Sequence, residues 1–130
     1  MKADTQEWVR CAEEDFQVAS SQFRLRARKS TANAIGFHCQ QCVEKYLKAR
    51  LAEAGLGVPK VHDLVLLLQR LMPVEPLWTS FAPALRGLND YAVKFRYPGH
   101  IATRADARAA LKACHSVRAE VRASLGLPRK

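Results

Sequence analysis

Apolar residues recur every three or four positions along most of the chain, which is the spacing of one face of an α-helix. No segment shows the strict alternation of apolar and polar residues that marks a half-buried β-strand. Trp8, Phe16 and Phe23 belong to the first apolar stripe. The pattern predicts five helices: one from Asp4 that fades before Ser30, one from about Thr31 to Ala54, one from His62–Asp63, one from about Ser80 to Phe95, and one from Thr103 to Leu125.

Residues suited to helix ends bound these segments. Two pairs have the spacing of a capping box, in which two side chains bond free backbone amides of the first turn. Glycine supplies two of the predicted stops, because it adopts the left-handed conformation that ends many helices. The pairs are Asp4 with Glu7 and Thr103 with Asp106, the stops are Gly55 and Gly126, and His62 or Asp63 caps the third helix.

The second helix is the longest, and its apolar residues spread over more than one face. Such a helix is contacted by several others, so we expect it at the centre of the fold. The predicted fold is all-α, an up-and-down bundle of four or five helices in which short loops make sequential helices antiparallel neighbours. We expect one domain over residues 1–126 and a short C-terminal tail at 127–130.

The chain carries 21 Lys and Arg against 12 Asp and Glu, a formal net charge of +9. This surplus favours anionic partners such as RNA, nucleotides or an acidic protein, through an attraction that salt weakens. Much of it lies at Arg24–Lys29 and in the last helix and tail. For any one cluster, the alternative is a solvated helix face that keeps the protein soluble.

The N-terminus from Met1 to Glu7 is polar and does not resemble a signal peptide. The longest apolar run, Leu64–Leu68, is far shorter than the ~20 residues that a membrane span needs. We therefore expect a cytoplasmic protein with no membrane contact.

Four cysteines occur, each in or next to the apolar phase of a predicted helix. Cys39 and Cys42 form a C-x-x-C pattern in mid-helix, but no second pair completes a zinc site and no strand–helix context favours a redox motif. We expect all four, including Cys11 and Cys114, to act as small hydrophobic residues, and we expect no metal and no cofactor.

Residues Asn33–Ala49 read N-A-I-G-F-H-C-Q-Q-C-V-E-K-Y-L-K-A, which resembles the signature helix of the HEPN superfamily as its small prokaryotic members carry it. Three further segments match in the expected order, and the Trp8 helix also fits, so the resemblance covers nearly the whole chain. These segments are Pro59–Leu64, Leu88–Tyr91 and Phe95–Pro98.

The resemblance implies a bundle of four or five helices that commonly forms homodimers. It also implies a protein that binds nucleotides or acts as a metal-independent endoribonuclease. Many small bacterial members are encoded beside a minimal nucleotidyltransferase as a toxin–antitoxin pair. In the nuclease members, the active motif is an Arg followed after four to six residues by a His, and the sites of two subunits meet at the dimer face.

Here the motif departs from that pattern, because only three residues separate Arg96 from His100. His100 also follows the helix stop at Pro98 and is predicted to lie in a loop, and Gly99 stands where a polar residue often precedes the histidine. The nuclease motif therefore does not carry over directly.

Arg96 and His100 nevertheless have the chemistry for a phosphate site, and they are the candidate catalytic residues. An Arg fork matches phosphate oxygens, and a His can transfer protons near neutral pH. Asn89 lies seven residues before Arg96, so on one continuous helix both would face the same way. The alternatives are that Arg96 stacks on Tyr97 or pairs with Asp90 or Glu44, and that His100 is an ordinary loop histidine.

A polar stripe on the second helix adds further candidates for phosphate binding. The alternatives for this stripe are a solvated face, an ion-pair network with Glu44, or an interfacial role for the histidine. His62 is expected to contact Asp63 or the backbone. The candidate ligand-binding residues are His38, Gln41, Lys45, Lys48, Asn89 and Tyr97.

Three functional hypotheses follow. The first is a dimeric module that binds nucleotide or RNA and works with a separately encoded nucleotidyltransferase. The second is a metal-independent ribonuclease toxin that uses Arg96 and His100. The third is a non-catalytic helical interaction protein whose polar stripe forms its dimer face.

Overall fold

The computed structural model describes residues 1–25 and 31–130, and over these residues the secondary structure is entirely helical. The all-α prediction is therefore confirmed. The five α-helices are α1 (Ala3–Arg24), α2 (Ala32–Ala54), α3 (Leu64–Leu71), α4 (Ala82–Asn89) and α5 (Arg104–Ser124), and the 3-10 turns are η1 (Pro76–Phe81), η2 (Asp90–Ala92) and η3 (Lys94–Arg96).

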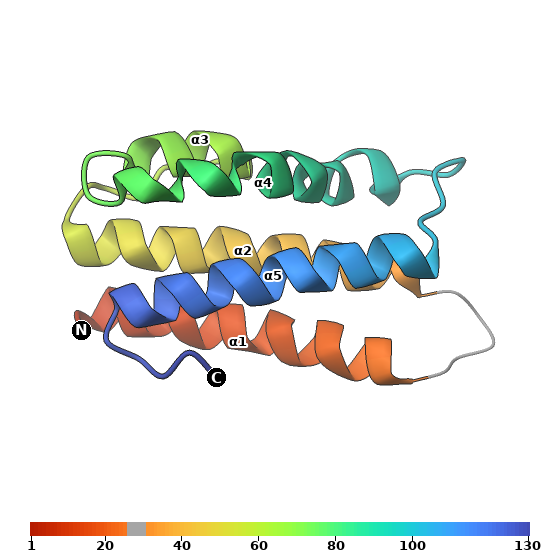
Figure 1. Ribbon diagram of the computed structural model, residues 1–130, viewed down its shortest axis with the longest axis horizontal. Coiled ribbons are helices and arrows are strands. Elements are labelled where there is room, and N and C mark those ends of the chain that lie inside the picture. Colours follow the sequence, from red (N-terminus) through yellow and green to blue (C-terminus); the bar gives the residue numbers. More distant parts are fainter. Residues whose placement is uncertain (26–30) are drawn as a thin grey trace.

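Helix α2 lies at the centre and contacts the other four α-helices, as its broad apolar surface predicts (Figure 1). Helices α1 and α5 run along one side of it, and the shorter α3 and α4 lie on the other. Ile35, Cys39, Val43 and Leu47 are at most 2% exposed. Burial of these side chains from water is the main source of the bundle's stability.

Helices α3 and α5 begin at the predicted caps. The Asp63 side chain accepts hydrogen bonds from the amides of Val65 and Leu66, and Thr103 and Asp106 form the predicted capping box. Gly55 follows α2 with a φ of 69°, the left-handed conformation that a residue with a Cβ adopts only at a cost.

The predicted capping box at the start of α1 is wrong. The helix begins at Ala3, so Asp4 lies inside its first turn, and Glu7 pairs with Arg10. A carboxylate from the last turn of α2 does the capping instead: Glu53 Oε1 accepts the Lys2 amide at 3.0 Å and the Thr5 hydroxyl at 2.9 Å. A contact between two helices therefore caps α1 in place of the predicted pair of neighbouring residues.

The predicted fourth helix is not continuous. The α-helical part ends at Asn89, and the chain then continues through η2 and η3, with Val93 between them at φ −123° and ψ −75°. Leu85, Leu88 and Tyr91 are buried, whereas Ala92 is partly exposed. Phe81 and Phe95 pack against the core while remaining partly exposed.

Cys39, Cys42 and Cys114 are buried and free, in line with the prediction of small hydrophobic residues, whereas Cys11 is partly exposed. Within residues 1–25 and 31–130, His, Cys, Asp and Glu side chains form no group of three suited to a metal ion. None of the described helices has the length and apolar character needed to cross a bilayer. Most of the basic run at Arg24–Lys29, residues 26–29, lies outside the described part of the chain.

Candidate functional site

The Arg96–His100 segment runs from the last residue of η3 into the connection to α5, at the end of the bundle away from the two termini (Figure 1). Asn33, in the first turn of α2, holds this connection at both ends. Its Nδ2 donates to the carbonyl oxygens of Phe95 at 3.0 Å and His100 at 2.9 Å, and its Oδ1 accepts the Ala102 amide at 2.6 Å. The loop is thus fixed to the central helix by one side-chain amide.

One turn further along α2, Gly36 gives the Tyr91 ring room to pack on the helix. A Cβ at position 36 would lie 2.0 Å from Cε1 of Tyr91, so only glycine fits beneath this ring. Tyr91 is 5% exposed and stacks on Phe95, with 4.7 Å between the ring centres. This packing fixes the chain immediately before Arg96.

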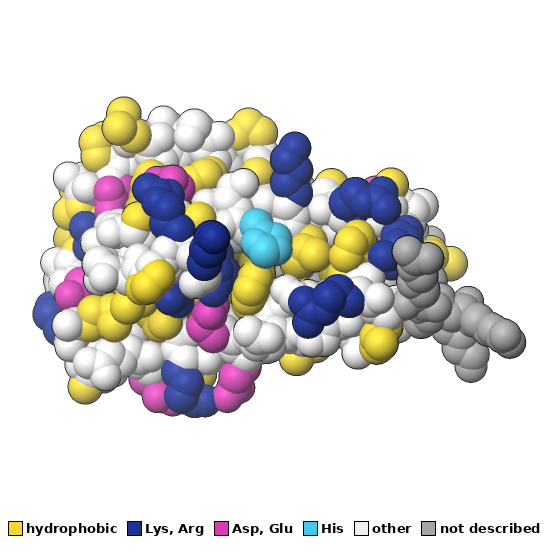
Figure 2. Space-filling view, turned by 60° about the horizontal axis from the view of Figure 1, so that its bottom comes forward, with side chains coloured by type: hydrophobic (Ala, Val, Ile, Leu, Met, Phe, Trp, Pro, Cys, Tyr) yellow, Lys and Arg dark blue, Asp and Glu magenta, His cyan; other side chains and the backbone are white. Residues whose placement is uncertain are grey.

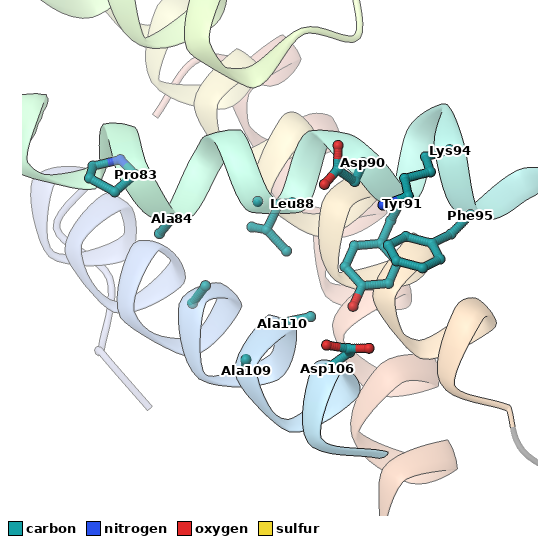
Figure 3. Close-up of a pocket in the computed structure, with 12 residues that line it drawn as sticks. Pro83, Ala84, Leu88, Asp90, Tyr91, Lys94, Phe95, Asp106, Ala109 and Ala110 are labelled. Carbon is teal, nitrogen blue, oxygen red and sulfur yellow. The ribbon is translucent and has the colours of Figure 1, made fainter. Parts of the chain in front are cut away.

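Tyr91 also lines a pocket of about 460 Å³ between α4 and α5 (Figure 3). Alanine and leucine side chains form much of its lining, and the Tyr91 hydroxyl points toward Asp106 at one end. Burial, followed by the nearby Asp106 carboxylate, raises the pKa of Tyr91 to about 12. The phenol is therefore protonated at neutral pH and available as a hydrogen-bond donor.

Arg96 is exposed, and its guanidinium carbon lies 5.4 Å from the centre of the Phe37 ring, on the same part of α2. Among the described residues it forms no ion pair with Asp90 or Glu44, the partners considered above. A cation–π contact leaves the charge and the donors of the guanidinium available to an anion.

His100 is exposed in the predicted loop, and within the described residues only its backbone carbonyl is hydrogen-bonded, to Asn33. Gly99 has a φ of 91° and turns the chain just before it. Tyr97 is 65% exposed, so it is available to a ligand or a partner. The short connection thus presents one guanidinium, one imidazole and one phenol.

The predicted common face of Asn89 and Arg96 is wrong, because the α-helix ends between them. The Asn89 side chain is engaged elsewhere: its Oδ1 accepts the Leu64 amide at 2.9 Å, and its Nδ2 donates to Asp63 Oδ1 at 2.9 Å. Asn89 therefore helps to hold the start of α3 and does not orient Arg96.

The polar stripe of α2 divides into two clusters. In the first, His38 and Lys45 converge on Asp15 of α1: His38 Nδ1 lies 2.8 Å from Oδ1, and Lys45 Nζ lies 2.6 Å from Oδ2. The Asp15 side chain is 11% exposed and the His38 side chain 30%. The side-chain amide of Gln41 donates to Gln40, which is buried.

The second cluster is internal. Lys48 is 5% exposed, and its ammonium lies 3.1 Å from Glu44 Oε2 and over the Trp8 ring. Glu44 also contacts His62 Nδ1 at 3.0 Å, a partner not predicted for that histidine. The ion pair with Glu44, the alternative considered for this stripe, is thus present at Lys48, and Lys48 does not face an external ligand.

On the face formed by α1 and α5, Lys and Arg side chains lie around a histidine, with acidic and apolar side chains among them (Figure 2). Guanidiniums stack on two rings of α1: Arg104 lies 4.1 Å from the centre of Phe23, and Arg118 lies 4.1 Å from that of Phe16. Arg118 also pairs with Glu13 at 2.7 Å. Part of the charge of α5 is therefore used within the fold.

Sequence reasoning missed Asn33, Gly36, Phe37 and Asp15 as residues that build the site. Their partners are remote: Asn33 contacts backbone atoms 62 to 69 positions away, and Asp15 contacts His38 across 23. The one local signal is Gly36, because a glycine inside a helix costs stability and marks a close approach.

Comparison with models of protein families matches residues 5–124 to the HEPN domain. No curated protein and no solved structure matches the chain. The match spans nearly the whole chain and overlaps all five α-helices, and it agrees with the resemblance seen in residues 33–49. HEPN domains typically form dimers and bind RNA, and the chain belongs to this family.

Proposed function

We propose that this HEPN domain is a nucleotide- or RNA-binding module that acts as a homodimer together with a nucleotidyltransferase partner. The observation that carries the proposal is Arg96, an exposed guanidinium on a loop that Asn33 fixes to α2. The net charge of +9 adds long-range attraction for an anionic ligand.

An Arg in this setting suits a phosphate group. Its planar fork donates two parallel hydrogen bonds to phosphate oxygens, and a loop already held in place loses little freedom on binding. The cation–π contact with Phe37 limits the directions in which the side chain can extend. Arg96 is therefore the proposed phosphate anchor, with Tyr97 and His100 beside it in the sequence.

The test is titration of fluorescently labelled single-stranded RNA, and separately ATP by calorimetry, into wild type, Arg96→Ala and Arg70→Ala. Arg70 is an exposed arginine in the last turn of α3, so Arg70→Ala removes the same charge at a different place and serves as the matched control. Loss of a charged hydrogen bond predicts an affinity about tenfold or more weaker for Arg96→Ala. Equal affinities in all three proteins would refute the anchor.

The same titrations at two salt concentrations address the nature of the binding. A phosphate contact predicts that affinity falls as salt rises and that Arg96→Ala shows a shallower salt dependence. A complete lack of RNA and nucleotide binding would leave the helical interaction protein as the remaining hypothesis.

One observation favours a second function, a metal-independent ribonuclease. The His100 side chain is exposed in the same short loop as Arg96, and no other described residue hydrogen-bonds it. Incubation of RNA with the protein in EDTA, compared with Arg96→Ala and His100→Ala, tests this function. Cleavage that disappears in both variants supports it, and the same background in all three proteins rejects it.

Support for the homodimer comes from apolar side chains around the proposed anchor. Val93 and Tyr97 are each 65% exposed and Ile101 is 80% exposed. Large apolar residues in contact with water favour a protein interface. We propose that this surface, defined by Val93, Tyr97 and Ile101, is the dimer face.

The proposed nucleotidyltransferase partner is tested by whether it co-purifies with the tagged domain.

A further inference from the structure

The Asp15–His38–Lys45 cluster presents an oriented imidazole at the surface between α1 and α2. Both carboxylate oxygens of Asp15 are engaged, one by His38 Nδ1 at 2.8 Å and the other by Lys45 Nζ at 2.6 Å. Asp15 is nearly buried, whereas the His38 side chain keeps 30% of its surface exposed. The imidazole is therefore held from the inside and open on the outside.

The hydrogen bond also determines which ring nitrogen carries the proton. A carboxylate beside an ammonium can only accept, so Nδ1 of His38 is the donor. In the neutral imidazole this leaves Nε2 with its lone pair, and no group in the described part of the chain bonds to Nε2. His38 thus offers an outward hydrogen-bond acceptor in a fixed orientation.

This acceptor lies close to the proposed phosphate anchor. The Phe37 ring centre is 5.6 Å from the centre of the His38 ring and 5.4 Å from the guanidinium carbon of Arg96. The His38 ring and the Arg96 guanidinium are therefore separated by no more than the sum of these distances, and both contact the same aromatic ring. A guanidinium that binds a phosphate and a hydrogen-bond acceptor at this spacing fit a sugar attached to a phosphate.

We propose that His38 recognises the ribose 2′-hydroxyl of a ribonucleoside phosphate whose phosphate is bound by Arg96. The inference rests on the proposed function. The 2′-hydroxyl donates to Nε2 of His38, and a deoxyribose has no hydroxyl to make this bond. The 2′-hydroxyl is the group by which a protein distinguishes RNA from DNA. The site therefore selects ribose, either in RNA or in a free nucleotide.

Two pairs of ligands differ only at the 2′ position and test the proposal on the wild-type protein. They are a single-stranded oligoribonucleotide against the same sequence in deoxyribose with deoxyuridine, and ATP against dATP. One hydrogen bond predicts a preference for ribose of about two- to tenfold. A preference in the oligonucleotide pair alone identifies RNA as the ligand, and one in the ATP pair alone identifies a nucleotide.

His38→Asn separates ribose recognition from a structural role. The Asn amide can still donate to Asp15 in place of Nδ1, but it places no acceptor where Nε2 was. We expect this variant to lose the ribose preference while its affinity for the deoxy ligands stays within about twofold of wild type. His115→Asn, at an exposed histidine of α5, is the matched control and should keep the preference.

Three results would overturn the inference. They are equal binding of ribose and deoxyribose ligands by wild type, an unchanged preference in His38→Asn, and equal weakening of both ligands in that variant. In the first two cases binding itself persists, so the proposed function would stand while ribose recognition falls. Failure of every ligand to bind wild type would refute the proposed function as well.

Discussion

The side-chain amide of Asn33 makes three hydrogen bonds, all to backbone atoms between Phe95 and Ala102. A buried or half-buried amide that satisfies three backbone groups is costly to remove, because those groups lose their partners together. We predict that Asn33→Ala lowers the free energy of unfolding by about 1–3 kcal/mol. Urea denaturation followed by circular dichroism measures this change.

The same substitution should weaken RNA binding even at temperatures where the protein is fully folded, because Arg96 then samples more positions. Asn33→Ala with wild-type affinity and a wild-type unfolding midpoint would mean that the loop is held by other contacts. The role of Asn33 could not be predicted from the sequence, since helix patterns report on neighbours three or four positions away and its partners lie beyond 60.

The resemblance points to Arg96 and His100 as candidates, and the loop position that the Pro98–Gly99 stop predicts for His100 is confirmed. Their surroundings could not be predicted from the sequence. The sequence suggests that Arg96 contacts its neighbour Tyr97 or an acidic residue, whereas in the structure its guanidinium contacts Phe37 of α2. Side-chain pairs that depend on how helices pack leave no periodic trace in the sequence.

At the scale of elements, Gly36 couples α2 to the chain before Arg96. We predict that Gly36→Ala destabilises the fold by about 1–3 kcal/mol, because the new Cβ overlaps the Tyr91 ring and overpacking forces a shift. Gly87→Ala is the matched control, since a Cβ at this position of α4 meets nothing within 4 Å. It should raise stability by up to about 1 kcal/mol through helix propensity.

Urea unfolding of the two alanine variants against wild type measures this contrast. A lower free energy of unfolding in Gly36→Ala and a higher one in Gly87→Ala support the close packing of Tyr91 on α2, whereas stabilisation by both substitutions would contradict it. A second readout is the near-UV circular dichroism of the tyrosine residues, which should change in Gly36→Ala and not in Gly87→Ala.

The start of α1 gives a prediction about pH. The Lys2 amide, and after it the Thr5 hydroxyl, hold the pKa of Glu53 below its ordinary value of 4.5. A carboxyl whose pKa is lower in the folded state stabilises the fold above its unfolded pKa, and this contribution is lost as the pH falls through the folded pKa. Glu53→Gln should therefore melt at a lower temperature than wild type at pH 7.

The difference in melting temperature between Glu53→Gln and wild type should shrink as the pH falls from about 4.5 toward 3. Thermal melts at pH 7, 4.5 and 3 measure it, with Glu14→Gln, at an exposed glutamate of α1, as the control for the loss of one charge. A constant difference at all three pH values would contradict the role of the ionised carboxylate.

Helix caps also show which elements could be predicted. The box at Thr103 and Asp106 and the stop at Gly55 depend on residues within one turn, and both are confirmed. The predicted box at Asp4 is wrong because Glu53 satisfies the first turn from another helix. The fourth helix ends at Asn89, where Asn89 contacts the start of α3 and Tyr91 packs on α2. Local signals predicted the ends that only local residues determine.

At the scale of the whole molecule, the proposed dimer face lies around the proposed ligand anchor. We predict that Ile101→Asp shifts the protein toward the monomer, because a charge placed at an apolar interface must lose its hydration. Leu77→Asp, at a residue of η1 that is 86% exposed, is the matched control and should remain dimeric.

Sedimentation equilibrium over a range of protein concentrations measures the state of both variants and of wild type. A monomeric wild type would refute the dimer, and equal dissociation of both Asp variants would refute the assignment of the face. If this surface is the dimer face, Ile101→Asp should also weaken RNA binding, since the Arg96 sites of the two subunits would no longer lie together.

A double-mutant cycle on RNA affinity, with wild type, Asn33→Ala, Arg96→Ala and the double variant, tests most directly whether Arg96 is the phosphate anchor and Asn33 acts by holding it in place. We predict that Arg96→Ala binds about tenfold or more weakly, and that the double variant binds no more than about twofold more weakly than Arg96→Ala alone. Wild-type affinity in Arg96→Ala, or losses that multiply in the double variant, would contradict it.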